Sequence, residues 1–364
     1  MKTLTITAAA LAAGFLFQTQ CFAQISTPTA SDPESQARET WRAFMAKNNS
    51  PSQKGCYHVT YPNALWESTD CKMAQPRVRF MRGKASYTGL EVAGTGGDYI
   101  AQVQGLISAA YGSFAVSGVS SESSVGTAIF NNGGILGPNE YTLQLNTNAN
   151  QTTAACAGHS GCTVWQQFVY ATDYYEAGEA ALFMQYWLIG WGTSECPIGW
   201  RPSEGDCVLN SASMAVPDFP ITDLGSMRLS AGATAGGYDD AAVFNGNEGW
   251  LIFAEDDAVD IATVWNLVEF NVLGDTGGSE ADFNYGSNIT ITFQLSDGSS
   301  SPPLCLGGIS ETGESNNLLL GSCQTSVSAV GPEMVFNEYL PAKRIYIPPD
   351  PFFPVEPVSY TFSK

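Results

Sequence analysis

The chain has 364 residues, of which only 14% are charged, and its formal net charge at pH 7 is -20. So acidic a protein repels nucleic acid and anionic membranes, and neither is expected as a partner. Low charge density combined with many glycine, serine, threonine and aromatic residues is typical of secreted all-β proteins.

The first 23 residues have the pattern of a secretory signal peptide. A basic start precedes an apolar run over 6–17, and the small residue Ala23 marks the expected cleavage site. We therefore predict a secreted protein, extracellular or periplasmic. Removal of 1–23 takes Cys21 away and leaves eight cysteines, an even number that indicates disulfides in an oxidising compartment. Pairing of neighbours in sequence order is the simplest arrangement, although spacing alone leaves the pairing open.

Charge divides the rest of the chain into two parts. Residues 24–84 carry nine basic and five acidic side chains, a net charge of +4, whereas residues 85–341 carry two basic and 28 acidic side chains, a net charge of -26. We predict that 24–84 is a basic N-terminal extension. It is either a pro-segment that docks on the acidic part by charge complementarity or an ordinary decoration. Residues 33–47 are predicted to form a helix, and the remainder of the extension to be loop-like.

From residue 98 onward, short apolar and β-branched runs alternate with turn residues, a pattern that predicts strands. The expected strands are 99–106, 113–119, 141–146, 163–170, 181–189, 223–229, 249–254, 263–272, 288–295 and 334–338. The acidic stretches 238–240 and 255–257 are predicted to be solvated turns. A single domain over 85–340, folded as a two-sheet antiparallel β-sandwich of the jelly-roll kind, fits this length. The proline-rich tail 341–364 is expected to be extended.

Three of the predicted strands place a tryptophan and a polar group on one face, because side chains alternate along a strand. These pairs are Trp265 with Glu269, Trp165 with Gln167, and Trp187 with Gln185. If the three faces line one concave sheet, they form an aromatic-walled groove with amides and a carboxylate at its floor. The alternatives are that the aromatics are ordinary sandwich core and that Glu269 lies on a solvated face.

Other catalytic chemistries lack support in the sequence. The two histidines, His58 and His159, each lie close to a cysteine that is expected in a disulfide, so a zinc cluster or a Ser-His-Asp triad is not predicted. The even cysteine count makes a free thiol nucleophile unexpected. We therefore expect no metal and no cofactor, and carboxylate and amide chemistry remains.

Four strand sequences resemble a known family. They are TVWQQ at 163–167, ALFMQYW at 181–187, LVEFN at 267–271 and EADFNYGSNITITF at 280–293. They are similar to successive strands of the eqolisins, the secreted fungal-type glutamic peptidases, over about half of the chain. The resemblance implies a concanavalin-like jelly roll, activity at acid pH, a pro-segment and no metal. It also implies a catalytic glutamine and glutamate on the concave sheet, at Gln167 and Glu269.

The chain departs from the family pattern in two places. The family has a tryptophan on the strand before the glutamine strand, where this chain has YTLQL at 141–145, and it has a glutamate where Gln185 stands. The cysteine-bounded stretch 196–207 has no evident counterpart. These differences are expected to change the shape of the groove and the charge around the predicted pair, Gln167 and Glu269.

The leading hypothesis is a secreted, acid-active endopeptidase that acts on polypeptides. Glu269 would activate a water molecule and Gln167 would orient it, with the subsites shaped by Trp165, Gln185, Trp187 and Trp265. The alternative is a non-catalytic carbohydrate-binding or adhesion module whose tryptophans stack on the sugars of a polysaccharide. A glycoside hydrolase is a third possibility, but it requires a second carboxylate near Glu269, and spacing predicts none.

Overall fold

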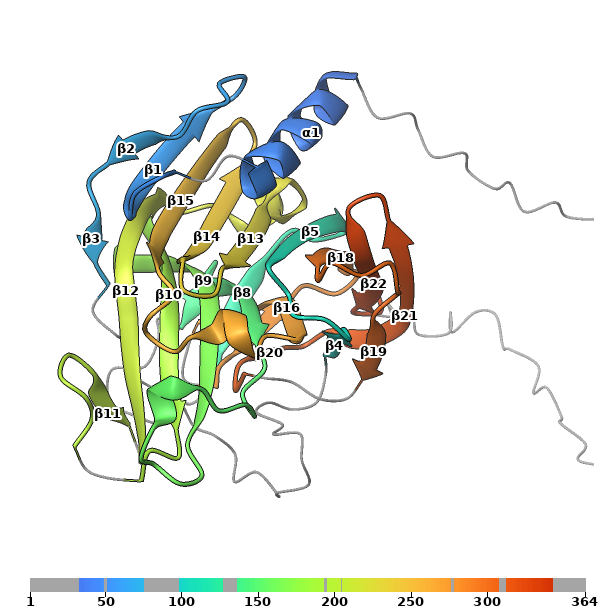
Figure 1. Ribbon diagram of the computed structural model, residues 1–364. Coiled ribbons are helices and arrows are strands. Elements are labelled where there is room, and N and C mark those ends of the chain that lie inside the picture. The colour runs from blue at the N-terminus through green and yellow to red at the C-terminus, as the bar shows by residue number, and fades with distance from the viewer. Residues whose placement is uncertain are drawn as a thin grey trace, which may run out of the picture.

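The computed structural model describes residues 33–48, 51–74, 98–126, 136–192, 195–203, 205–275, 278–307 and 312–342. They form one α-helix, α1 (Pro33–Asn48), and two large antiparallel sheets packed face to face (Figure 1). The predictions of an all-β sandwich and of a helix at 33–47 are confirmed. The predicted signal peptide, residues 24–32, 49–50 and 75–84 of the basic extension and most of the proline-rich tail lie outside the described residues. No helix in the described ranges has the length and apolar character needed to span a membrane.

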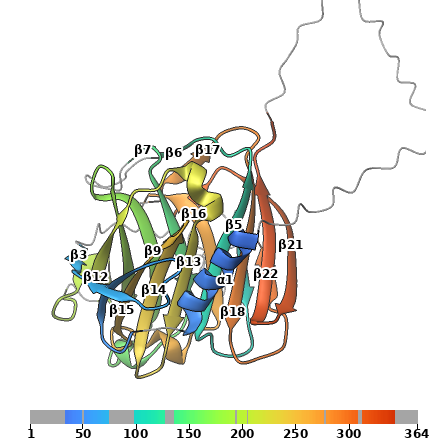
Figure 2. The same ribbon diagram turned by 90° about the horizontal axis from the view of Figure 1, so that it is seen from above.

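The first sheet has nine strands among the described residues, in the order β2-β1-β15-β14-β13-β5-β18-β22-β21. In that order their bounds are Glu67–Thr69, Gly55–Thr60, Glu248–Glu255, Tyr238–Asn245, Arg228–Ala233, Ala109–Ser117, Asn288–Ser296, Gly331–Tyr339 and Leu319–Ser328. Helix α1 lies against this sheet (Figure 2), where Trp41 packs on Phe244.

The second sheet contains the predicted glutamine and glutamate strands. Its order is β11-β12-β10-β9-β8-β16-β4-β19, and β3 also pairs with β12. The bounds are β11 Arg201–Ser203, β12 Asp206–Pro217, β10 Glu179–Ile189, β9 Thr163–Glu176, β8 Tyr141–Thr147, β16 Leu267–Gly274, β4 Tyr99–Gln102, β19 Leu304–Gly307 and β3 Lys72–Met73. A small sheet beside β16 consists of β20 (Ser315–Asn316), β17 (Glu280–Phe283), β6 (Glu122–Val125) and β7 (Gly137–Pro138). Among the described residues, three short 3-10 helices span Ala154–Cys156, Ile221–Ser226 and Ile261–Thr263.

The core lies between the two large sheets and follows from strand alternation. Val268, Phe270 and Val272 of β16 belong to it, so the intervening residues of β16 face the other way. Phe270 reaches the first sheet, because a Cβ on Gly112 of β5 would lie only 2.4 Å from the Phe270 ring. Each such buried aromatic or aliphatic side chain contributes about 1.5–3 kcal/mol. This packing buries one face of the second sheet in the core, so a functional site on this sheet can lie only on the opposite face.

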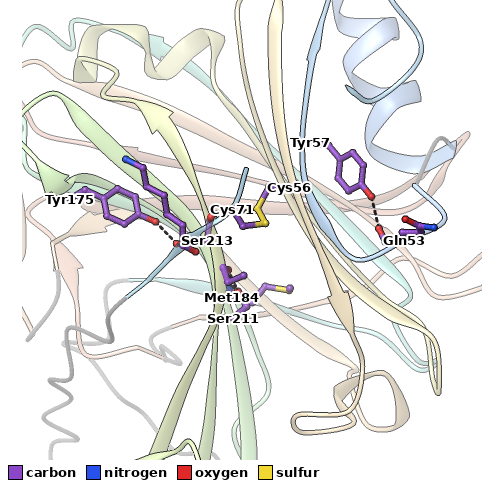
Figure 3. The surroundings of a disulfide bond; sticks show 10 residues. Gln53, Cys56, Tyr57, Cys71, Tyr175, Met184, Ser211 and Ser213 are labelled. Carbon is purple, nitrogen blue, oxygen red and sulfur yellow. Dashed lines mark hydrogen bonds between the residues drawn. A yellow bond between two sulfur atoms is a disulfide. The ribbon is translucent and has the colours of Figure 1, made fainter. Parts of the chain in front are cut away.

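Residues 51–74 do not form the predicted loop. They form β1, β2 and β3, because β1 finds a partner in β15 of the first sheet and β3 in β12 of the second. The Cys56–Cys71 disulfide ties these strands together and lies between the two sheets (Figure 3). This segment therefore joins the sheets at one edge of the sandwich.

The side chains around the Cys56–Cys71 disulfide support this junction from both sheets. The Tyr57 hydroxyl donates to the Gln53 carbonyl at 2.6 Å, and the Tyr175 hydroxyl is hydrogen bonded to Ser213 Oγ (Figure 3). The disulfides of the described residues all join neighbours in sequence order, the simplest of the possible pairings. They are Cys56–Cys71, Cys156–Cys162, Cys196–Cys207 and Cys305–Cys323.

Two further local predictions are wrong. Residues 221–226, at the start of the strand predicted over 223–229, form a 3-10 helix, and the strand begins at Arg228. The acidic stretch 238–240 is the start of β14 and not a solvated turn, because Asp239 and Asp240 pair with β13 on one side and β15 on the other. Its central residue, Asp239, is buried between the sheets and accepts a hydrogen bond from Gln166 at 2.8 Å.

Candidate functional site

A row of polar side chains crosses the second sheet on the face turned away from the first sheet. The strand register places Glu269 opposite Asn146, Asn146 opposite Gln167, Gln167 opposite Gln185, and Gln185 opposite Asn210. Neighbouring strands lie about 4.8 Å apart, so the backbones of Glu269 and Gln167 are about 10 Å apart with Asn146 between them. Folding thus brings Glu269, Gln167 and Gln185 onto one face, as predicted.

Hydrogen bonds connect the carboxylate of Glu269 to the amide of Gln167. Asn146 Nδ2 donates to Glu269 Oε2 at 2.9 Å. Gln167 Nε2 in turn donates to Asn146 Oδ1 at 3.0 Å and to Gln144 Oε1 at 3.0 Å. Amide groups linked in this way polarise one another, so each donor in the chain strengthens the next. The row is one connected network that ends on a carboxylate.

Trp187 determines how the Gln167 amide is oriented. Its indole N–H donates to Gln167 Oε1 at 3.2 Å and to Gln185 Oε1 at 3.0 Å. Because an indole N–H can only donate, the oxygen of Gln167 must face Trp187 and its NH2 group must face Asn146. Gln185 Nε2 continues the row by donating to Asn210 Oδ1 at 2.9 Å. Trp187, predicted as a subsite residue, thus also positions both glutamines.

Apolar side chains flank the polar row on both sides. Trp165 and Trp187 pack with ring centroids 6.2 Å apart on one side, next to Ile189. Val169 and Phe183 lie on the other side. The arrangement has the predicted character of an aromatic-walled polar floor, although Trp165 and Trp187 are both buried.

Trp265 does not join this face, and its predicted position is wrong. Strand β16 begins at Leu267, so the alternation that predicts a shared face with Glu269 does not extend back to residue 265. The residues before β16 form a 3-10 turn, and Trp265 turns into the core between the sheets. There it stacks on Phe168 with centroids 5.7 Å apart, and its indole N–H donates to the Leu267 carbonyl at 3.0 Å.

Two further carboxyl groups lie near Glu269, contrary to the expectation from spacing. Asn271 shares the face of Glu269, and its Nδ2 donates to Asp98 Oδ2 at 2.9 Å and to Glu338 Oε1 at 3.0 Å. Burial raises the pKa of Asp98 well above its usual value, and the negative charges of Glu269 and Glu338 raise it further. Burial also raises the pKa of Glu338, to about 7, against the lowering effect of hydrogen bonds from Asn271 and Asn316.

Four residues of this site are absent from the sequence-based predictions: Gln144, Asn146, Asp98 and Glu338. Gln144 and Asn146 carried a usable signal, because polar and apolar residues alternate along 141–147 and the polar set must share one face. Asp98 and Glu338 carried none. They lie more than 60 residues from Glu269 in the chain, and only the folded arrangement brings them together.

The part of the row from Glu269 to Gln185 is closed to solvent in this structure, whereas Asn210 at the far end is partly exposed. The side chains of Glu269 and Asn146 are fully buried, and Gln167 is 2% exposed. Ala74, from the end of the described part of the N-terminal extension, packs in the same cluster as Val169 and Phe183. Within the described ranges no three His, Cys, Asp or Glu side chains are grouped as a metal site would require.

Comparison with known proteins finds only distant structural similarity. No family profile matches the chain, and no curated protein has a significantly similar sequence. Among solved structures, scytalido-glutamic peptidase in complex with a transition state analog inhibitor is 11% identical, with a TM-score of 0.32, and the match covers 68% of this chain and 100% of that one. SCP-B, a member of the eqolisin family of peptidases in complex with the tripeptide Ala-Ile-His, is 13% identical, with a TM-score of 0.28, and the match covers 66% of this chain and 97% of that one. These are similarities of fold alone.

Proposed function

We propose that the chain is a secreted, acid-active endopeptidase of the glutamic type, in which Glu269 is the general base and Gln167 the amide that orients water and substrate. The observation that supports this most strongly is the row itself. A single carboxylate lies two strands from a glutamine whose NH2 group is turned toward it, and Asn146 bridges the two by hydrogen bonds. Such preorganised donors beside a carboxylate suit addition of water to a carbonyl group.

The proposed reaction proceeds in two steps. The Glu269 carboxylate removes a proton from water, and the hydroxide that forms attacks the carbonyl carbon of the scissile peptide bond. An N–H group of Gln167 or Asn146 exchanges one of its hydrogen bonds within the row for one to the carbonyl oxygen and so stabilises the negative charge there. Glu269 then returns its proton to the amide nitrogen as the C–N bond breaks, which yields a carboxylic acid and an amine.

A polypeptide reaches Glu269 only when this face is uncovered, because Glu269 and Gln167 are buried. We propose that part of the extension 24–84 acts as a pro-segment whose release precedes activity. The contact of Ala74 with Val169 and Phe183 supports this proposal, because it places the extension on the same face as Gln167. In contrast, α1 packs on the first sheet and β1 pairs with β15 of that sheet.

The test is hydrolysis of a denatured protein substrate across about pH 2 to 8, a range that spans carboxylate and histidine titrations. The secreted chain is assayed before and after incubation in acid, which would permit release of the pro-segment. Glu269→Gln is expected to lower kcat by about 100- to 10,000-fold, the usual contribution of a general base. Glu122→Gln is the matched control. Burial raises the pKa of Glu122 to about 9, so it is already neutral in acid and its amide should leave kcat unchanged.

Equal activity of Glu269→Gln and the wild-type chain would contradict the assignment, and so would cleavage confined to neutral pH. Absence of cleavage by the acid-treated, folded wild-type chain would contradict the peptidase function itself. The sugar-binding alternative loses one of its three predicted stacking residues, because Trp265 lies in the core between the sheets. Trp165 and Trp187 are at most 1% exposed and, like Glu269, are accessible to a ligand only when this face is uncovered.

A further inference from the structure

Gln144 lies beside the proposed catalytic pair, and its amide group is fully engaged in hydrogen bonds. It comes from β8, two residues before Asn146, and is 3% exposed. Its Oε1 accepts from Gln167 Nε2 at 3.0 Å and from Asn146 Nδ2 at 3.3 Å. Its Nε2 donates to Thr142 Oγ1 at 3.0 Å, and the side chain is also hydrogen bonded to the carboxyl group of Glu314. Every donor and acceptor position of this amide is thus used.

Thr142 determines which way the Gln144 amide points. The Thr142 hydroxyl donates to the Gly274 backbone carbonyl at 3.0 Å, and a carbonyl oxygen can only accept. Because the single hydrogen of the hydroxyl is used in this way, Thr142 Oγ1 can only accept from Gln144. The NH2 group of Gln144 must therefore face Thr142. Its oxygen faces the other way, toward the NH2 groups of Gln167 and Asn146.

A set of hydrogen bonds with one direction therefore crosses four strands. It runs from the carbonyl of Gly274 on β16 through β8 and β9 to the indole of Trp187 on β10. Trp187 can only donate and fixes the Gln167 amide from one side, and Gln144 fixes it from the other. A reversed Gln167 amide would place its oxygen against the Gln144 oxygen and its NH2 group against the indole N–H. The two ends of the set thus require the same orientation of Gln167.

We propose that Gln144 is a positioning residue of the endopeptidase, which holds the NH2 groups of Gln167 and Asn146 ready for the carbonyl oxygen of the scissile peptide bond. The Gln144 oxygen suits this role because it accepts two N–H groups at once. When one of them turns to the substrate, the other keeps this buried oxygen hydrogen bonded, so no buried acceptor is left unpaired. This inference rests on the proposed function of Glu269 and Gln167.

The test compares the kinetics of Gln144→Met with those of two variants at residue 142, in acid and per folded molecule. Gln144→Met keeps the length of the side chain and removes its hydrogen bonds. Its kcat should fall by about 5- to 150-fold, the effect of two lost hydrogen bonds, with KM nearly unchanged. Thr142→Val keeps the shape of the side chain and removes the hydroxyl, so kcat should fall by about 2- to 12-fold. Thr142→Ser loses a methyl group but keeps the hydroxyl, so it should restore most of the wild-type kcat.

Thr147→Val is the matched control. Thr147 is also fully buried on β8, but its hydroxyl is hydrogen bonded to backbone atoms of Gln166 and Asn148, so its variant should keep the wild-type kcat. An unchanged or higher kcat in Gln144→Met would overturn the inference. So would equal losses in Thr147→Val and Thr142→Val, or a larger loss in Thr142→Ser than in Thr142→Val, since these indicate packing and not orientation of the amide. In all these cases the wild-type chain still cleaves in acid and the proposed function stands, whereas a wild-type chain that cleaves at no pH removes both.

Discussion

Gln166 and Gln167 are neighbours on β9, yet they make glutamine–carboxylate networks of different kinds on opposite faces of the sheet. Gln166 points into the core and donates to Asp239 Oδ2 at 2.8 Å, across the gap between the two sheets. Gln167 points away from the core and is linked through Asn146 to Glu269 within its own sheet. Both networks join a glutamine to a carboxyl group, but they lie on opposite faces of the sheet, and only the second has a bridging asparagine.

The two networks also differ in how completely their hydrogen bonds are formed. Gln166 Oε1 is buried with no hydrogen-bond partner among the described residues. Gln167, in contrast, donates two hydrogen bonds from its amide nitrogen and accepts one from the Trp187 indole at its amide oxygen. A fully connected network holds its members in one geometry, as a catalytic site requires, whereas a partial one serves to join two packed surfaces. Under the proposed function, the contrast separates a catalytic network from a structural one.

The sharpest test of this contrast is Gln167→Ala against Gln166→Ala. Loss of the Gln167 amide should lower kcat by about 100- to 1,000-fold, as removal of an oxyanion donor does, with a smaller effect on stability. Loss of the Gln166 amide should leave kcat per folded molecule unchanged. It should lower the free energy of unfolding by about 1–3 kcal/mol, because Asp239 then loses its buried donor. Kinetics and denaturant unfolding measured on the same samples distinguish the two outcomes. A loss of kcat in Gln166→Ala and of stability alone in Gln167→Ala would contradict the assignment of the two networks.

Asp239 and Asp256 lie on the same side of the sheet as Gln166, and their raised pKa values predict that the stability of the fold declines as pH rises. Burial raises the pKa of Asp256 to about 6, and burial and the charge of Asp256 raise that of Asp239 well above its usual value. The folded chain then binds more protons than the unfolded chain above about pH 4, so stability is greatest below that pH and is lost as pH rises through the folded pKa values. Thermal unfolding should show Tm falling from about pH 4 to 7.

Asp239→Asn should reduce the fall in Tm, since the asparagine oxygen still accepts from Gln166 without acquiring a charge. Asp257→Asn, at an exposed residue next to Asp256, is the control and should leave the fall unchanged. A Tm that stays constant or rises over this range in the wild-type chain would contradict the prediction.

The smallest expected effect concerns the tryptophan that orients Gln167. Trp187→Phe removes the N–H donor to Gln167 and Gln185 while keeping most of the packing, and a net hydrogen bond is worth about 0.5–1.5 kcal/mol. We expect kcat to fall by about 2- to 12-fold, the same energy expressed as a rate. Trp165→Phe, in the neighbouring ring of the same cluster, is expected to leave kcat closer to wild type. Equal effects of the two variants would mean that packing, and not orientation of Gln167, is responsible.

The sequence by itself determined the class of fold, the existence of most long strands and the face on which many side chains lie. Alternation along 163–170 and 181–189 predicted that Gln167 and Gln185 face the same way as their tryptophans, because the pleat of a strand is local geometry. The same rule failed at Trp265, because the strand predicted from residue 263 begins four residues later, at Leu267.

Only the tertiary structure decided which strands are neighbours and how they are aligned. Local residue patterns do not specify lateral order or register, because these depend on the summed packing of both sheets. That packing inserts β8 between β9 and β16 and so places Asn146 between Gln167 and Glu269. It also brings Asp98 and Glu338, remote in sequence, to the end of the same row. Glu269, Gln167 and Gln185 were thus predicted from the sequence, but Asp98, Glu338 and the hydrogen bonds that connect the site depend on long-range pairing.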